Sequence, residues 1–179
     1  MLFISKARAL AFGQPEPLDA VALIRDQLER MQPLLERRRM QPDVCLPESL
    51  PEVRGYRLLL DRALANLISN AIRHAEPGSP LIIEAAEKQG VVRLSFRNRG
   101  DVSEAFEEHA FDRFWSGSSA RTRTEDAAHS GLGLAIVKAA VEACQGRVVA
   151  QAHDGWVRFD LYLTACPKNN SSKDETGTA

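Results

Sequence analysis

The chain has 179 residues, of which 44% are hydrophobic and 26% are charged, so it is long enough for one well-buried domain and too short for two domains of ordinary size. Lysine and arginine together number 23 against 24 aspartate and glutamate residues, and the net charge is -1. This balance excludes the basic excess that marks a nucleic-acid-binding domain, so we expect no nucleic-acid partner.

Cysteine usage and hydropathy indicate a cytosolic location. Cys45, Cys144 and Cys166 are odd in number, far apart and without ligand spacing, which fits a reducing compartment better than a disulfide framework or a zinc site. No apolar run approaches the length of a membrane span, and Lys6 and Arg8 interrupt the first residues too early for a signal peptide. We expect the chain as given to be soluble.

The first third of the chain predicts two helices and a short strand. Residues 1–12 place apolar side chains at helical spacing, and the glycine and prolines of residues 13–17 end that helix and begin a linker. A second helix is predicted for residues 19–38, with its first residue, an aspartate, as N-cap. Residues 44–46 are a short strand candidate, and residues 51–55 are expected to form a loop.

A helix predicted for residues 60–75 has two different faces. The buried stripe consists of apolar residues at spacings of three and four: Leu60, Leu64, Leu67, Ile68 and Ala71. The opposite side carries Arg62, Asn66, Ser69, Asn70 and Arg73. Asparagine is a poor residue inside a helix, so Asn66 and Asn70, one turn apart, are a local cost that a bound ligand could offset. Taken alone, a solvated polar face remains the better interpretation.

A hairpin is predicted next, with strands at residues 81–87 and 91–98. The second strand alternates, and its inward face carries Val92, Leu94, Phe96 and Asn98. An inward amide close to Gly100, where a backbone can be approached closely, suits contact with the edge of a flat heterocycle. An ordinary Asn-x-Gly turn is the alternative.

Residues 99–130 show no sustained periodicity apart from a turn of helix within residues 103–111. Loops longer than about 12 to 15 residues inside a compact domain are usually functional lids or disordered. The sequence FDRFW, residues 111–115, is expected to anchor the base of this loop through its three aromatic side chains. The residues after it are small and polar, which indicates a lid over a pocket.

The sequence GLGLA opens a predicted helix from Gly131 to about Gln145, with Ser130 as N-cap and Gly146 as C-terminal stop. Free N–H groups and the positive end of a helix dipole suit a phosphate, and a missing Cβ lets the ligand approach. A Rossmann interpretation is excluded because a loop precedes the glycines where a strand is required, and the Walker pattern is absent.

The chain closes with a predicted hairpin, residues 147–152 and 156–163, around an Asp154-Gly155 turn. Residues 166–179 are rich in lysine, asparagine, serine and threonine and are expected to form a disordered tail.

Together these segments resemble the N, G1, F and G2 boxes of the ATP-binding catalytic domain of bacterial sensor histidine kinases, in the superfamily that includes gyrase, Hsp90 and MutL. LANLISNAIRHA is similar to the N box, FDRFW to the F box and SGLGLAIVKAAVEACQGRV to the G2 box. The resemblance covers about residues 18–163. It implies the Bergerat fold, an α/β (α+β) two-layer sandwich in which a mixed sheet of about five strands packs on three helices and a long lid covers ATP.

The resemblance also implies a role for each matching residue. It makes Asn70 the Mg²⁺ ligand through its amide oxygen, a suitable donor for a hard cation, and gives Asn66 a supporting role. Arg73 is implied to face the phosphates, and Asn98 to meet the adenine amino group with Gly100 beneath it. The other implied nucleotide-binding residues are His74, Phe111, Gly131, Leu132, Gly133 and Leu134. The two glycines of that set are implied to supply the lid hinge and the phosphate-facing backbone.

Three positions depart from the family pattern. Asn98 replaces the usual aspartate, which keeps the acceptor and loses the carboxylate. Tyr56 replaces an acidic residue, and Ser116 stands where an arginine often follows the F box. This leaves Arg121 or Arg123 as the candidate to reach the γ-phosphate. The working catalytic set is Asn70, Arg73 and Arg121.

The resemblance divides the chain into three parts. Residues 1–17 are implied to be the tail of a dimerisation helix and a linker, residues 18–165 the ATP-binding catalytic domain with a lid at 99–130, and residues 166–179 the tail. The family's phosphoacceptor histidine lies on the dimerisation helix beside an acidic residue, and we expect none of the four histidines of this chain to lie on a helix with an acid beside it.

The implied partners are a histidine-containing dimerisation domain upstream in the same protein and a response regulator. The segment is expected to be a monomer, the full-length protein a homodimer, and the location the cytoplasmic portion of an inner-membrane sensor. The favoured hypothesis is the catalytic part of a histidine protein kinase that binds ATP and Mg²⁺. The alternatives are a nucleotide-binding regulatory domain without transfer activity and a serine kinase of the anti-sigma type on the same fold.

Overall fold

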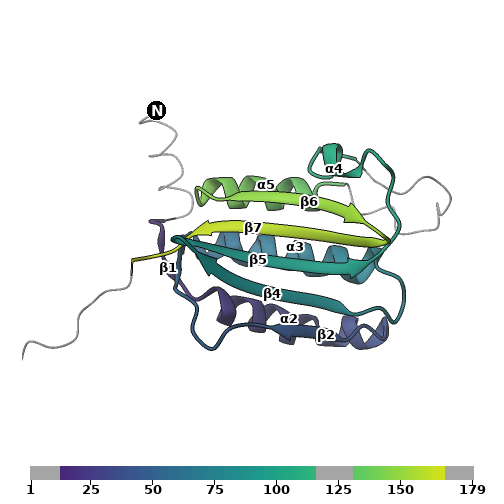
Figure 1. The fold of residues 1–179 in the computed structure, drawn as a ribbon, viewed down its shortest axis with the longest axis horizontal. Helices are drawn as coiled ribbons and strands as arrows, with labels where there is room; N and C mark the ends of the chain where they lie inside the picture. Colours follow the sequence, from purple (N-terminus) through teal and green to yellow (C-terminus); the bar gives the residue numbers. More distant parts are fainter. Residues whose placement is uncertain (1–12, 116–130, 168–179) are drawn as a thin grey trace, which may run out of the picture.

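The computed structural model describes residues 13–115 and 131–167, which form two layers (Figure 1). The elements in chain order are β1 (Glu16–Leu18), α2 (Ala20–Arg37), β2 (Pro42–Cys45), β3 (Val53–Gly55), α3 (Arg57–His74), β4 (Leu81–Lys88), β5 (Val91–Arg99), α4 (Phe106–His109), α5 (Gly133–Ala143), β6 (Arg147–His153) and β7 (Trp156–Thr164). None of the described helices is both long and apolar enough to cross a membrane.

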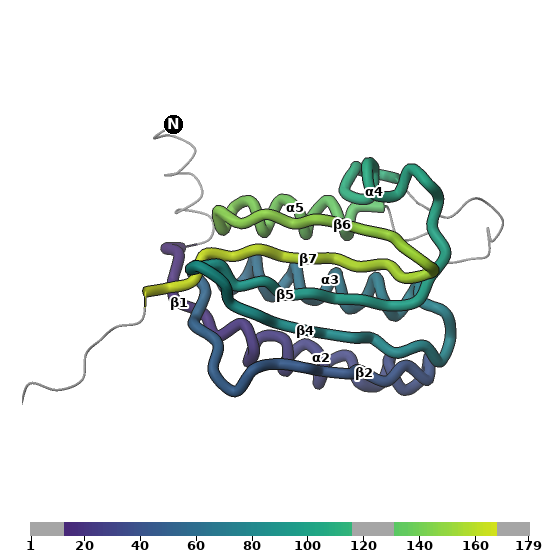
Figure 2. Tube along the Cα trace, viewed as in Figure 1, coloured from purple at the N-terminus to yellow at the C-terminus, as the bar shows by residue number. Residues whose placement is uncertain are grey.

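One layer is a five-stranded sheet in the order β2-β4-β5-β7-β6. The edge strand β2 is parallel to β4, and the other neighbours are antiparallel. The helices α2, α3 and α5 lie behind the sheet in Figures 1 and 2 and form the second layer. The predicted mixed sheet of about five strands packed on three helices is therefore confirmed.

The core forms where the two predicted apolar patterns meet. On β5, Leu94 and Phe96 are almost fully buried, and their register partners on β7, Leu161 and Phe159, are buried as well. Every member of the apolar stripe predicted for α3 is buried, together with Ala63 and Ile72. The apolar residues that alternate along the strands and the apolar residues that recur every 3.6 positions on the helix thus form the two faces that pack against each other.

The short strands near the N-terminus differ from the prediction. The strand β2 begins two residues earlier than expected, and the predicted loop at 51–55 contains β3. The residues predicted as linker contribute β1, which pairs with β3 in an antiparallel two-stranded sheet. Strands of three or four residues interrupted by proline are too short to show a period, so only pairing with a distant segment defines them.

The C-terminal end of the domain extends slightly past its predicted limit. The N–H of Cys166 donates to the carbonyl oxygen of Glu52 at 2.7 Å, and Ala165 forms a bridge with Val53. Cys166 therefore belongs to the folded part rather than to the predicted tail. Residues 168–179 and 1–12 lie outside the described residues, so their predicted roles stay predictions.

Both ends of α5 differ from the prediction. The helix begins at Gly133, two residues late, and its N-cap is Leu132; the predicted cap, Ser130, lies outside the described residues. At the other end Gln145, with φ 58°, adopts the left-handed conformation that often ends a helix, one residue before the predicted stop at Gly146. Gly146 is needed for a different reason, because a Cβ there would lie 2.6 Å from the carbonyl oxygen of Tyr162.

The C-terminal end of α3 is held by Arg38, the residue that follows α2. Its Nε donates to the carbonyl oxygen of Ile72 at 2.9 Å, and its Nη2 donates to those of Arg73 at 3.1 Å and Ala75 at 3.3 Å. The last carbonyl groups of a helix lack partners inside the helix, and a cation also interacts favourably with the negative end of the dipole. Arg38 therefore stabilises the end of α3 that carries the predicted site residues.

We predict that Arg38→Ala lowers the free energy of unfolding by about 1–3 kcal/mol, because hydrogen bonds from a charged donor are lost and carbonyl groups are left without partners. Chemical denaturation measures this change. Arg37→Ala is the matched control, since Arg37 is exposed on the last turn of the same helix. Equal stability of the two variants would contradict a capping role for Arg38.

Candidate functional site

The polar face of α3 carries two of the amide residues predicted for the site. Asn66 and Asn70 are half-buried on this face, one turn apart. The Nδ2 atom of Asn66 is buried and has no hydrogen-bond partner among the described residues. Buried amide groups are nearly always paired, so this atom indicates a group that binds here.

The start of α5 faces Asn66. A Cβ atom built on Gly133 would lie 3.8 Å from the Oδ1 of Asn66, so the glycine leaves open space beside the amide. Among the described residues, no side chain caps the first turn of α5. The first N–H groups of a helix carry partial positive charge, and without a capping side chain they are available to an anion. The structure thus brings together Asn66 and Gly133, which the sequence placed in one site.

The end of β5 meets the end of α3. Asn98 is 4% exposed, and its Nδ2 donates to the carbonyl oxygen of Arg99 at 3.0 Å, which leaves Oδ1 as an acceptor. A Cβ atom on Gly100 would lie 3.4 Å from the carbonyl oxygen of His74. The prediction that Asn98 points inward is confirmed, and Gly100 allows the strand and the helix to approach closely.

Two basic side chains end α3 in different environments. The Nη2 of Arg73 donates to the Oγ of Ser69 at 3.1 Å, so the guanidinium lies back along its own helix. Partial burial of the imidazole, with smaller contributions from the cations of Arg73 and Arg38, lowers the pKa of His74 below its usual value of 6.5. His74 is therefore neutral at neutral pH. The implied contact of Arg73 with phosphates stays a prediction.

An aromatic cluster anchors the segment after β5. Phe111 packs edge-on against Phe159 with ring centroids 6.3 Å apart, and Trp115 packs against Phe106 at 6.0 Å. Phe114, in contrast, is 73% exposed, so its predicted anchoring role is wrong. Its φ of 65° turns the chain and directs the ring outward.

Sequence reasoning missed Phe106, the buried centre of this cluster. Its ring lies 5.9 Å from that of Phe159, and it is 5% exposed. The signal was present, because Val102, Phe106 and Ala110 recur at a spacing of four, as on one face of a helix. The helix α4 is only four residues long and lies beside β6 (Figure 2). A hydrogen bond holds it there, in which Oε1 of Glu107 accepts from the N–H of Ala152 at 2.8 Å.

Gly131 ties this aromatic segment to α5. Its carbonyl oxygen accepts from the N–H of Phe114 at 3.1 Å, and its φ is 60°. A Cβ atom at this position would lie 2.8 Å from the Cα of Phe114, so no other residue fits without a backbone shift. Leu132 follows as the N-cap residue, and Leu134 is half-buried against the core.

The predicted lid residues Ser116, Arg121 and Arg123 lie outside the described residues, as does His129. His109 differs from the expectation that no histidine lies on a helix beside an acid. It ends α4, and its Nδ1 lies 2.8 Å from the Oδ2 of Asp112.

The site lacks a cluster of metal-binding side chains, since no group of three or more His, Cys, Asp or Glu residues in the described part of the chain could hold an ion. Asn70 offers one amide oxygen at the open margin of the site. A single protein oxygen fits Mg²⁺ when phosphate oxygens and water complete the shell, as is usual for this ion.

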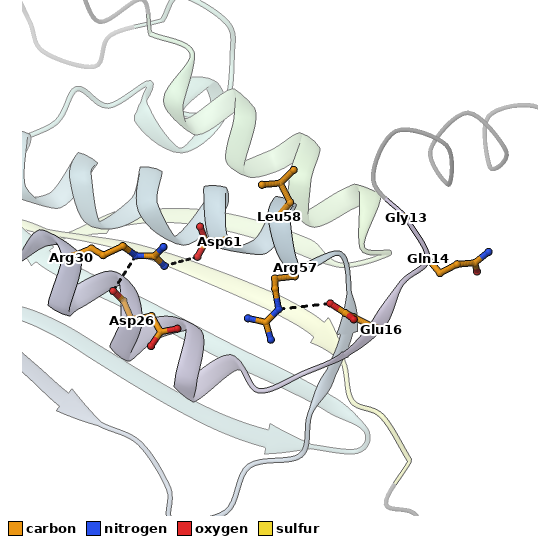
Figure 3. A pocket seen from close by; sticks show the side chains of 8 residues that line it. All are labelled: Gly13, Gln14, Glu16, Asp26, Arg30, Arg57, Leu58 and Asp61. Carbon is orange, nitrogen blue, oxygen red and sulfur yellow. Dashed lines mark hydrogen bonds and ion pairs between the residues drawn. The ribbon is translucent and has the colours of Figure 1, made fainter.

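A cavity of about 580 Å³ lies at the opposite end of α3 and contains none of the predicted site residues (Figure 3). Four of its charged side chains form two pairs, with Arg30 and Asp61 2.7 Å apart and Arg57 and Glu16 3.7 Å apart. We interpret these pairs as structural contacts between β1, α2 and α3.

Comparison with known proteins agrees with this arrangement. Residues 55–178 match the model of the family described as histidine kinase-, DNA gyrase B-, and HSP90-like ATPase. The chain is 35% identical over 155 residues to the sensor protein SphS of Synechococcus elongatus, covering 82% of this chain and 37% of SphS. It is 33% identical over 150 residues to the signal transduction histidine-protein kinase BaeS of Escherichia coli, covering 83% of this chain and 31% of BaeS. The chain thus spans about a third of the length of these two relatives.

Solved structures show the same fold. The mycobacterial sensor histidine kinase MprB superposes with a TM-score of 0.70 at 25% identity, covering 85% of this chain and 99% of that one. The catalytic domain of histidine kinase ThkA superposes with a TM-score of 0.73 at 20% identity, covering 86% and 99%. With more than half of its length matched by the family model, the chain belongs to the histidine kinase-, DNA gyrase B- and HSP90-like ATPase family.

Proposed function

We propose that this chain is the ATP-binding catalytic part of a sensor histidine kinase, which donates the γ-phosphate of ATP to a histidine on a separate dimerisation domain. The observation that carries the proposal is the pairing of Asn66 with the uncapped start of α5. The Nδ2 of Asn66 is buried without a partner among the described residues, and the Oδ1 of the same amide lies 3.8 Å from a Cβ built on Gly133, so the amide borders the start of α5, where we place the phosphates. The names of the relatives, sensor proteins and histidine kinases, support the same conclusion.

The residues divide the work of holding the nucleotide. The N–H groups of α5 and Nδ2 of Asn66 donate to phosphate oxygens, and Oδ1 of Asn98 accepts from the exocyclic amino group of adenine. Gly100 lets β5 and the end of α3 approach closely beside Asn98, beneath the proposed position of the base. Bound Mg²⁺, held by Asn70, would supply charge neutralisation between the phosphates. Catalysis then rests on orientation and charge stabilisation, because in-line attack by an acceptor imidazole needs no covalent step on this chain.

The partners follow from the activity. The acceptor histidine belongs to a dimerisation domain in the same protein, and the phosphate passes on to a response regulator. The dimerisation domain makes the full-length protein a homodimer, and this part of it works in the cytoplasm below a membrane sensor. The covered share of SphS and BaeS, about a third of each, leaves room for such additional domains.

We expect phosphotransfer from ATP to an isolated histidine-bearing dimerisation domain added in trans, with a rate that rises when the two domains are joined. Joining raises the effective concentration, on the order of millimolar for a short flexible connection. Gly133→Val should abolish transfer, because the methyl groups of the valine would occupy the space beside Asn66. The variant should still fold, since a Cβ at this position clashes with no described atom. Labelled ATP and gel analysis measure the transfer.

The chemistry of the product decides between the alternatives. Phosphohistidine is labile in acid, whereas a serine kinase of the anti-sigma type would leave an acid-stable phosphate. His109→Gln is a necessary control, since His109 has an acidic neighbour and could be labelled itself. Nucleotide binding without transfer to any acceptor would contradict the kinase proposal and favour a regulatory domain.

We predict that Asn70→Ala removes the Mg²⁺ dependence of ATP binding, because Asn70 is the proposed protein ligand of the ion. Isothermal titration calorimetry with and without Mg²⁺ measures the effect. Asn70→Asp is the matched control and should retain Mg²⁺ dependence, since a carboxylate keeps an oxygen donor. Unchanged affinity of Asn70→Ala for Mg·ATP would refute the assignment.

We predict that Asn98→Ala weakens ATP binding roughly tenfold or more, the loss expected when one buried polar contact is left unmade. Binding of inorganic triphosphate should be unaffected, because the contact of Asn98 is with the base. Calorimetry with both ligands separates the two effects. Equal losses for ATP and triphosphate would show that the substitution disturbs the site as a whole.

A further inference from the structure

The face of the sheet that does not contact the helices forms a second surface of interest. In Figures 1 and 2 this outer face is turned toward the viewer, and no described helix or strand passes in front of it. An antiparallel sheet commonly leaves one face in water, so exposure by itself indicates nothing. The composition of the face is what distinguishes it.

The outer face is strongly basic. The strand registers direct to it the arginines Arg93, Arg97, Arg99, Arg147 and Arg158, together with Lys88. The acidic residues on the same face are Asp43, Glu84 and Asp160. The whole chain has a net charge of -1, so positive charge is concentrated here and balanced elsewhere on the protein. Such a field attracts an acidic partner.

Aromatic rings hold several of these arginines in place. The guanidinium carbons of Arg97 and Arg99 lie 5.1 and 4.7 Å from the centre of the Trp156 ring, and that of Arg147 lies 4.6 Å from the centre of the Tyr162 ring. A stacked guanidinium keeps its N–H groups free at its edge and loses less entropy when it binds a carboxylate.

The centre of the face contains buried polar atoms without partners. Ser95 and Asp160 are register partners and are 1% and 2% exposed. The Oγ of Ser95, the Oδ1 of Asp160 and the Nε of Arg97 have no hydrogen-bond partner among the described residues. The Nε of Arg158 forms an ion pair with Oδ2 of Asp160 at 2.9 Å but lacks the geometry of a hydrogen bond.

Unpaired donors and acceptors in such a cluster indicate a missing binding partner, because buried polar groups are almost always satisfied. Most of the buried unpaired side-chain atoms of the described residues lie on this one face. A hollow of about 770 Å³ continues the surface at one end, where its lining includes Lys88, Arg93, Arg147 and Tyr162.

We propose that the outer face of the sheet docks an acidic polypeptide segment of a partner protein. Carboxylates of the segment pair with Arg93, Arg97 and Arg158. The oxygens of Ser95 and Asp160 are buried, so backbone N–H groups of the segment reach them only once Arg158, whose Nε lies 2.9 Å from Oδ2 of Asp160, turns outward to meet a carboxylate. The phosphate backbone of a nucleic acid fits less well, since it offers no N–H donor to Asp160, whereas a polypeptide carries a backbone N–H beside each acidic side chain. A polypeptide supplies donors and acceptors together.

This surface is separate from the nucleotide site. Arg97 is next to Asn98 in the chain, but Asn98 points to the inner face of β5 and Arg97 to the outer face. The hollow lies at the other end of the same strand from Asn98, roughly 25 Å away for the strand's rise per residue. Substitutions on the outer face can therefore be tested without changing the residues proposed to bind ATP.

The test uses a fluorescently labelled peptide of alternating glutamate and serine, with binding followed by anisotropy at low ionic strength. We expect saturable binding that the double variant Arg93→Glu with Arg97→Glu weakens by about tenfold or more. The matched control, Arg25→Glu with Arg54→Glu, makes the same change in net charge at exposed positions away from the face and should change the affinity by less than about twofold. ATP binding should be unchanged in both.

A milder pair, Arg93→Gln with Arg97→Gln, decides the question if the charge-reversed protein does not fold, as judged by thermal unfolding. Absence of saturable peptide binding would overturn the proposal, as would equal weakening by the control pair. Binding of duplex DNA or of phosphatidylserine vesicles as tightly as the peptide, and equally sensitive to Arg97, would also overturn it and would indicate a non-protein polyanion.

Discussion

The guanidinium of Arg38 is the contact on which the geometry of the proposed site depends. It joins the end of α2 to the carbonyl oxygens of Ile72, Arg73 and Ala75 at the end of α3. The last turns of α3 carry Asn70, Arg73 and His74, and the adjoining carbonyl of His74 limits the space at Gly100. A frayed helix end would misplace all of them at once, because orientation within a fraction of an ångström determines how a polar group contacts a nucleotide.

The proposed site lies where elements from distant parts of the sequence converge. The polar face of α3 supplies the amides, the start of α5 supplies N–H groups that no described side chain caps, and the end of β5 supplies an inward amide. The aromatic cluster around Phe106 fixes the segment that follows β5, since the rings of Phe106 and Phe111 pack on Phe159 of β7. This packing holds the segment next to the proposed site in place.

The sheet separates two surfaces of different chemistry. Its inner face is apolar and is closed by the helices except at the edge where the nucleotide is proposed to bind. Its outer face combines cations stacked on aromatic rings with buried, unpaired polar atoms. Because alternate residues of β5 and β7 point to opposite sides, the same strands can serve both surfaces without sharing a side chain. A substitution on one face can therefore change nucleotide binding or partner docking without changing the side chains that serve the other.

The sequence by itself determined the elements with a clear period, including α3, α5 and the strands β4, β5 and β7, because burial of one face requires a repeat of 3.6 or two residues. The order of its motifs also predicted, through the family resemblance, that Asn66, Asn98 and Gly133 share one site, and the structure brings Asn66 and Gly133 together. Only the tertiary structure decided the pairing of β1 with β3, the capping of α3 by Arg38 and the exposure of Phe114. These features depend on contacts between residues far apart in the chain or on a single backbone φ, and neither leaves a local pattern. The unpaired atoms of Ser95 and Asp160 belong to the same class, because alternation predicts only that they face outward and packing by neighbouring arginines decides that they are buried.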